Sequence, residues 1–95
     1  MSEIAVKRRL RERKRRITTT LEAQGYRVRT FETGPFHLLA CRGKTALAIR
    51  VSFEEGRSHD AEVNLVRLEP VPERCLREVW TISDDGRIVT IARIA

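Results

Sequence analysis

The sequence contains few of the residues on which several protein classes depend. Its 95 residues include only two cysteines, three prolines and five aromatic side chains. No apolar run reaches the roughly 18 residues of a membrane span, and the N-terminus lacks the apolar segment of a secretory signal. Cys41 and Cys75 form no CxxC pair and have no histidine at metal-ligand spacing, so we expect two buried free thiols in a reducing cytoplasm.

Basic charge, in contrast, is abundant and unevenly distributed. Lysine and arginine number 19 against 13 acidic residues, which gives a net charge of +6. Residues 1–16 contain eight of these basic residues and only two acidic ones, so the remainder of the chain is balanced. Residues 1–16 therefore account for the net positive charge of the whole protein.

Hydrophobic periodicity predicts seven elements in one domain, 1–95, with a single core. The order is α-β-β-β-α-β-β, which is typical of an α+β fold whose helices cover a mixed, twisted sheet. The predicted helices span about 3–24 and 60–68, and the predicted strands span about 26–30, 36–41, 45–53, 76–83 and 87–94.

Local signals predict the helix ends and the buried face of the first helix. Ser2 can cap that helix, Gly25 suits the position after its last turn, and Asp60 can cap the second helix. Apolar residues at spacings of four, seven and four form one stripe along the first helix. They are Val6, Leu10, Ile17 and Leu21.

Three stretches of the chain carry a family resemblance. They are FHLLACRG at 36–43, AIRVS at 48–52 and REVW at 77–80. With the element order, they resemble the restriction-endonuclease-like PD-(D/E)XK superfamily, in particular its small resolvase-type and Mrr-like nucleases. In that family the second strand carries a metal-binding Asp and the third carries Glu-x-Lys. The resemblance implies a restriction-endonuclease-like fold with a degenerate motif, because the matching positions are His37, Arg50 and Ser52.

The residues at these three positions do not form a catalytic metal site. Mg²⁺ in nucleases is held by carboxylates and phosphate oxygens, and none of the three residues is a carboxylate. We therefore expect no catalytic residue, no metal and no other cofactor there. Arg50 would accept a phosphate or, the reading we favour, form a half-buried ion pair. The candidate partners are Glu12, Glu22 and Glu78.

The basic run of the first helix predicts an anionic partner. Like charges one turn apart destabilise a helix unless a partner offsets them, although a solvated face that only aids solubility is the alternative. The helix lacks the aromatic residues that anchor a helix to a membrane surface, so we favour nucleic acid over a membrane. The candidate binding residues are Lys7, Arg8, Arg9, Arg11, Arg15 and Arg16.

Two functions of different class follow. The first is a catalytically inactive nuclease-fold module that binds nucleic acid, in particular duplex or branched DNA, through the first helix. The second is an active, Mg²⁺-dependent DNA nuclease that uses relocated carboxylates. The resemblance is compatible with a homodimer in either case. The candidate carboxylates are Glu12, Glu22, Glu54 and Glu55.

Overall fold

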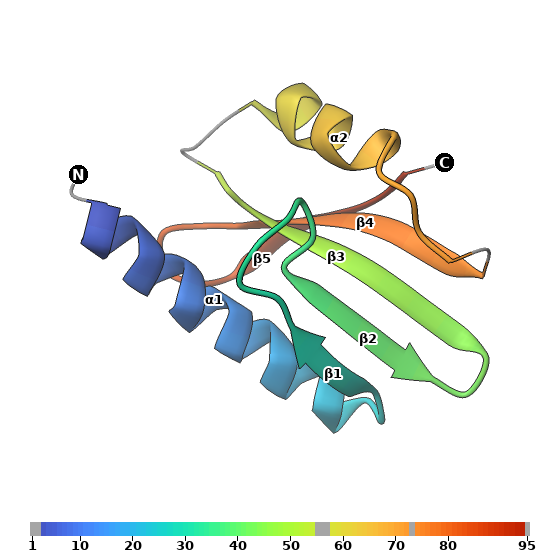
Figure 1. Cartoon of the computed structure of the whole chain (residues 1–95). Helices are drawn as coiled ribbons and strands as arrows, with labels where there is room; N and C mark the ends of the chain where they lie inside the picture. Colours follow the sequence, from blue (N-terminus) through green and yellow to red (C-terminus); the bar gives the residue numbers. More distant parts are fainter. Residues whose placement is uncertain (1–2, 55–57, 73, 95) are drawn as a thin grey trace.

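A five-stranded sheet lies between two helices in the computed structural model, which describes residues 3–54, 58–72 and 74–94 (Figure 1). The element order is α-β-β-β-α-β-β, so the predicted α+β class and order are confirmed. In chain order the elements are α1 (Glu3–Ala23), β1 (Arg27–Thr30), β2 (Leu38–Arg42), β3 (Thr45–Phe53), α2 (His59–Arg67), β4 (Cys75–Ile82) and β5 (Ile88–Ile94).

The sheet is mixed, and its strands follow one another in chain order from β1 to β5. Only β3 and β4 run parallel, and the other three pairs are antiparallel. A parallel pair needs a crossover connection, which α2 and its flanking segments supply. The chain consequently places α1 on one face of the sheet and α2 on the other.

Each face of the sheet has its own hydrophobic core. The side chains of β3 alternate between the two cores, with Ile49 and Val51 towards α1 and Ala48 towards α2, as the period of two predicts. The core beneath α1 contains Ile17, Leu21, Leu38, Ala40, Leu47, Ile49, Val51, Trp80 and Ile82. The core beneath α2 contains Phe36, Ala48, Val63, Val66, Cys75 and Val79.

The helix ends follow the local sequence, with one correction. Gly25 has a φ of 90° and donates to the carbonyl of Glu22 at 3.0 Å, so it ends α1 as predicted. The N-cap of α2 is Ser58, whose Oγ accepts from the Ala61 amide at 3.3 Å, and the predicted cap at Asp60 is wrong. Because α2 begins earlier, Asp60 lies in its first turn, where a negative charge still favours the helix. The predicted cap at Ser2 falls outside the described residues.

Cys41 and Cys75 are both free, and Cys75 is buried as predicted, but Cys41 is partly exposed, so the predicted burial is wrong for Cys41. Among the described residues, neither helix has the length and apolar composition needed to cross a membrane.

Candidate nucleic-acid interface

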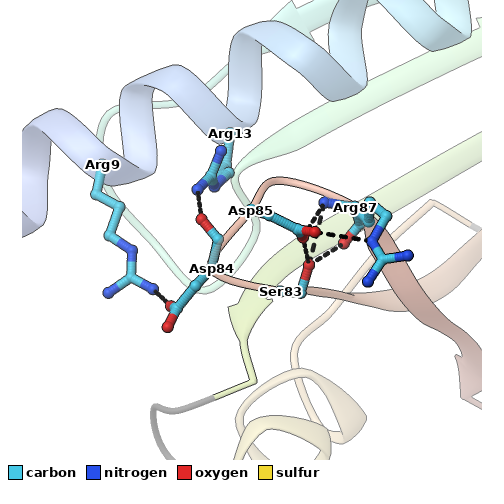
Figure 2. Close-up of polar contacts among 6 residues, drawn as sticks. All are labelled: Arg9, Arg13, Ser83, Asp84, Asp85 and Arg87. Atoms are coloured by element: carbon cyan, nitrogen blue, oxygen red, sulfur yellow. Dashed lines mark hydrogen bonds and ion pairs between the residues drawn. The ribbon is translucent and has the colours of Figure 1, made fainter.

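The basic residues of α1 divide between two sides of the helix, and one side contacts the turn between β4 and β5 (Figure 2). Arg9 forms an ion pair with the Asp84 carboxylate. Arg13 donates to the Asp84 carbonyl at 2.6 Å, and Arg16 donates to the Asp85 carbonyl at 3.3 Å. We call these three residues the turn-facing arginines, and they tie α1 to a turn some 70 residues away in the chain.

The turn between β4 and β5 is held by hydrogen bonds among its own residues and contains a glycine with a positive φ. The Asp85 carboxylate accepts from the Ser83 hydroxyl and from the Arg87 amide, and these bonds, with Ser83 the larger cause, lower the pKa of Asp85 (Figure 2). Gly86 has a φ of 89°, and a Cβ atom there would collide with the guanidinium of Arg16. The positive φ therefore favours glycine at this position, and a larger residue would displace the guanidinium groups of Arg13 and Arg16.

The other side of α1 presents arginines to solvent. Arg8, Arg11 and Arg15 are exposed, and their side chains form no hydrogen bond or ion pair with any residue that the structure describes. Their spacings of three and four residues place them in one row along successive turns. We call these residues the exposed basic row. Lys7 is also exposed and lies one turn before Arg11.

The six predicted binding residues therefore have two different environments. Lys7 and the exposed basic row face solvent, whereas Arg9 and Arg16 contact the turn. One basic residue of α1, Lys14, has a third environment because its side chain is buried. The sequence prediction omitted Lys14, although its position four residues after Leu10 and three before Ile17 places it in the apolar stripe.

Arg50, one of the three residues at the positions that the PD-(D/E)XK resemblance singled out, forms an ion pair on the α2 side of the sheet. Its Nε donates to the Glu62 carboxylate of α2, and its Nη1 donates to the Pro35 carbonyl at 2.7 Å. The exposed fractions of the two charged side chains are only 16% and 8%. The predicted half-buried ion pair is thus present, but with a partner that the sequence analysis did not name.

The three predicted partners of Arg50 are wrong because they lie elsewhere in the fold. Glu12 and Glu22 belong to α1, which covers the opposite face of the sheet. Glu78 points to that opposite face as well, where it accepts from Trp80 and forms an ion pair with Arg93 at 3.0 Å. The signal for the true partner was an acidic residue four positions before Val66, within the buried stripe of α2.

His37 lies just before β2 and not within the strand, contrary to prediction. Its Nδ1 accepts from the Val51 amide at 2.8 Å, so its side chain takes the place of a strand carbonyl where the β2–β3 ladder ends. Burial, followed by the charges of Arg50 and Lys14, lowers the pKa of His37 from 6.5 to about 4. The ring is therefore neutral at pH 7, and because Nδ1 accepts, the proton is on Nε2.

The remaining motif position and the relocated carboxylates do not come together. Ser52 is buried in β3, while Glu12, Glu22 and Glu54 are exposed at separate places, and Glu55 lies outside the described residues. Within 3–54, 58–72 and 74–94, no three His, Cys, Asp or Glu side chains are grouped so that they could hold a metal ion.

Comparison with known proteins adds no relative to this picture, since the chain matches no protein-family model and shows no significant similarity to any curated protein.

Proposed function

We propose that this protein is a catalytically inactive module with a restriction-endonuclease-like fold that binds nucleic acid, in particular duplex or branched DNA, through α1. The observation that carries the proposal is the exposed basic row, in which three arginines on successive turns have no internal partner among the described residues. Their mutual repulsion is relieved when a polyanion lies along the helix. Phosphate contacts of this kind supply most of the affinity of non-specific DNA binding.

The fold assignment is supported by the architecture. The order α-β-β-β-α-β-β and the mixed sheet with one helix on each face agree with what the resemblance implies. The stretches that carry the resemblance form β2, β3 and β4, the three central strands. A homodimer and a cytoplasmic location remain predictions from the sequence.

The absence of catalysis is supported by the chemistry of the motif positions. Arg50 places a guanidinium where the family has a carboxylate, and the nearest acid, Glu62, is already neutralised by it. The neutral ring of His37 is committed through Nδ1 to the Val51 amide. A hard divalent cation needs several oxygen ligands, which these residues do not offer.

Salt-dependent binding measurements test the proposal. Fluorescence anisotropy of a labelled duplex, a four-way junction and a single strand is recorded at several concentrations of KCl. In the triple variant Arg8→Ala, Arg11→Ala and Arg15→Ala, we expect the slope of log K against log salt to flatten by about 3 units, since each phosphate contact contributes about −0.9.

A matched control separates α1 from net charge. The variant Arg27→Ala, Arg29→Ala and Lys44→Ala removes the same charge from exposed positions outside α1. Equal losses in the two triple variants, or no binding by the wild-type protein at low salt, would overturn α1 as the interface. Cleavage of plasmid or junction with Mg²⁺ or Mn²⁺ that disappears on changing Glu12, Glu22 or Glu54 would overturn the inactive assignment.

A further inference from the structure

A basic pocket of about 410 Å³ lies between α1 and the connection from β1 to β2. Its volume is within the range of small-molecule sites. Three basic side chains of α1 line it, and Glu32 is the single acidic residue among the described residues that do so. The polar lining comprises Lys7, Arg11, Lys14, Glu32, Thr33 and His37.

Lys14 is the unusual member of this lining. It is only 8% exposed, and its Nζ donates to the Phe31 carbonyl at 2.7 Å. No ion pair with a carboxylate is formed by Lys14 among the described residues, and Glu32 is not within ion-pair distance of it. A buried ammonium without a counterion is costly, and one carbonyl uses only one of its three N–H groups. This environment favours an anion in the pocket.

His37 adds a neutral donor to the same pocket. Its Nδ1 is occupied by the Val51 amide, so its Nε2–H is the group left to bond a ligand. Arg11 adds a planar fork that matches two oxygens of one phosphate. Arg11 is also the middle member of the exposed basic row. A nucleic-acid backbone that lay along Arg8 and Arg15 would therefore pass the pocket and place one of its phosphates there.

From this arrangement we infer that the pocket between α1 and residues 31–37 binds one phosphate group of the nucleic acid without a metal ion, through Arg11, Lys14 and the Nε2–H of His37. The inference rests on the proposed function for the source of the phosphate. The shared chemistry is a tetrahedral phosphate, which a phosphodiester or a free phosphate both present.

The first measurement uses inorganic phosphate as the probe. Proton–nitrogen NMR spectra of the full chain are recorded during a phosphate titration at pH 7, with chloride at matched ionic strength as the reference. We expect the His37 Nε2–H and the Gly34 amide, both at the pocket, to shift with phosphate and not with chloride. Equal responses to the two anions would overturn the site.

Matched variants then locate the binding. Arg11→Ala and Arg8→Ala each remove one exposed arginine from the same helix, but only Arg11 lines the pocket. We expect phosphate affinity to fall about tenfold or more in Arg11→Ala and to stay within about twofold in Arg8→Ala, since hydrogen bonds between charged groups have this strength. His37→Asn keeps an acceptor for the Val51 amide and removes the Nε2–H, so it should weaken phosphate binding in a folded protein.

Competition with DNA separates this inference from the proposed function. Phosphate that displaces DNA, together with a larger loss of DNA affinity in Arg11→Ala than in Arg8→Ala, supports a nucleic-acid phosphate in the pocket. Phosphate binding without any DNA binding overturns the nucleic-acid source and the proposed function together, and leaves a site for a small phosphorylated molecule. If the protein binds DNA but its NMR spectrum does not respond to phosphate, and Arg11→Ala and Arg8→Ala lose equal DNA affinity, the pocket is overturned and the proposed function stands.

Discussion

The turn-facing arginines and the exposed basic row occupy the same helix and have the same chemistry, yet they have opposite surroundings. The turn-facing arginines bind a carboxylate and two carbonyls of the β4–β5 turn. The side chains of the exposed basic row bind no acceptor among the described residues. The basic residues of α1 therefore do not form a single binding surface. Only the arginines that the fold leaves without acceptors remain available to an external anion.

Arg50 extends this comparison to the interior. Of the turn-facing arginines, Arg9 and Arg13 are partly shielded from solvent and Arg16 is exposed, whereas the Arg50–Glu62 pair is largely buried between β3 and α2. Mutations that leave a charge unpaired should therefore destabilise the protein least in the exposed basic row, more at the turn-facing arginines and most at the Arg50–Glu62 pair, because the cost of an unpaired charge rises with its burial.

The largest effect is expected from breaking the buried pair. Glu62→Ala leaves Arg50 buried without its carboxylate and should lower the free energy of unfolding by about 3–5 kcal/mol. Urea denaturation followed by circular dichroism measures it. The exposed-row triple variant serves as the control, because solvent-exposed substitutions usually change stability by only about 0.5 kcal/mol each. A loss below about 1 kcal/mol for Glu62→Ala would contradict the ordering by depth.

The second effect concerns pH and His37. Because the pKa of His37 is lowered to about 4 in the folded protein, the unfolded chain binds more protons between pH 6.5 and 4. The stability contributed by the neutral ring is complete above pH 6.5 and is lost as pH falls towards 4. The loss should approach ~3 kcal/mol. Urea midpoints measured across this window should fall in the wild-type protein and much less in His37→Asn, and parallel curves would contradict the assignment.

The third effect tests how closely the turn-facing arginines approach the turn. Gly86→Ala and Gly34→Ala both place a side chain at a positive φ, 89° and 95°, but only at Gly86 would the new Cβ meet other atoms, those of the arginine guanidiniums. We expect each variant to lose about 1–2 kcal/mol from backbone strain. Gly86→Ala should lose more in thermal unfolding, and equal losses would show that the contact with α1 adds nothing.

Much of the fold was predictable from local sequence. The period-two pattern of 45–53 fixed the bounds of β3, and Gly25 fixed the end of α1, because both depend on neighbouring residues alone. The partners of the charged residues were not predictable in this way. Arg9 meets Asp84 only because the β4–β5 turn folds back beside α1, and that placement depends on the whole sheet.

Two buried charged residues were missed for a different reason. Lys14 and Glu62 are charged residues inside apolar stripes, although charged residues are seldom buried. Helical spacing alone would have marked both as buried and in need of a partner. The strand prediction for His37 was wrong because the Val51 amide donates to the His37 side chain and not to a backbone carbonyl of a paired strand.

The smallest effect on stability is expected when Arg9 loses its partner in the β4–β5 turn and becomes available to an external anion, as the exposed basic row is. Asp84→Asn removes the carboxylate partner of Arg9 while the ring of Phe53, 4.7 Å from the guanidinium, stays in place. Such partly exposed ion pairs contribute about 0–1 kcal/mol, so stability should fall by less than ~1 kcal/mol.

The released arginine should instead appear in DNA binding. We expect Asp84→Asn to raise affinity and to steepen the slope of log K against log salt by about 0.9, the contribution of one further phosphate contact. Asp60→Asn removes the same charge from an exposed position on α2, far from the turn in the chain, and controls for net charge. If both variants raise affinity equally with an unchanged slope, Arg9 stays unavailable even without its partner, and position on the helix, not internal pairing, decides which arginines bind.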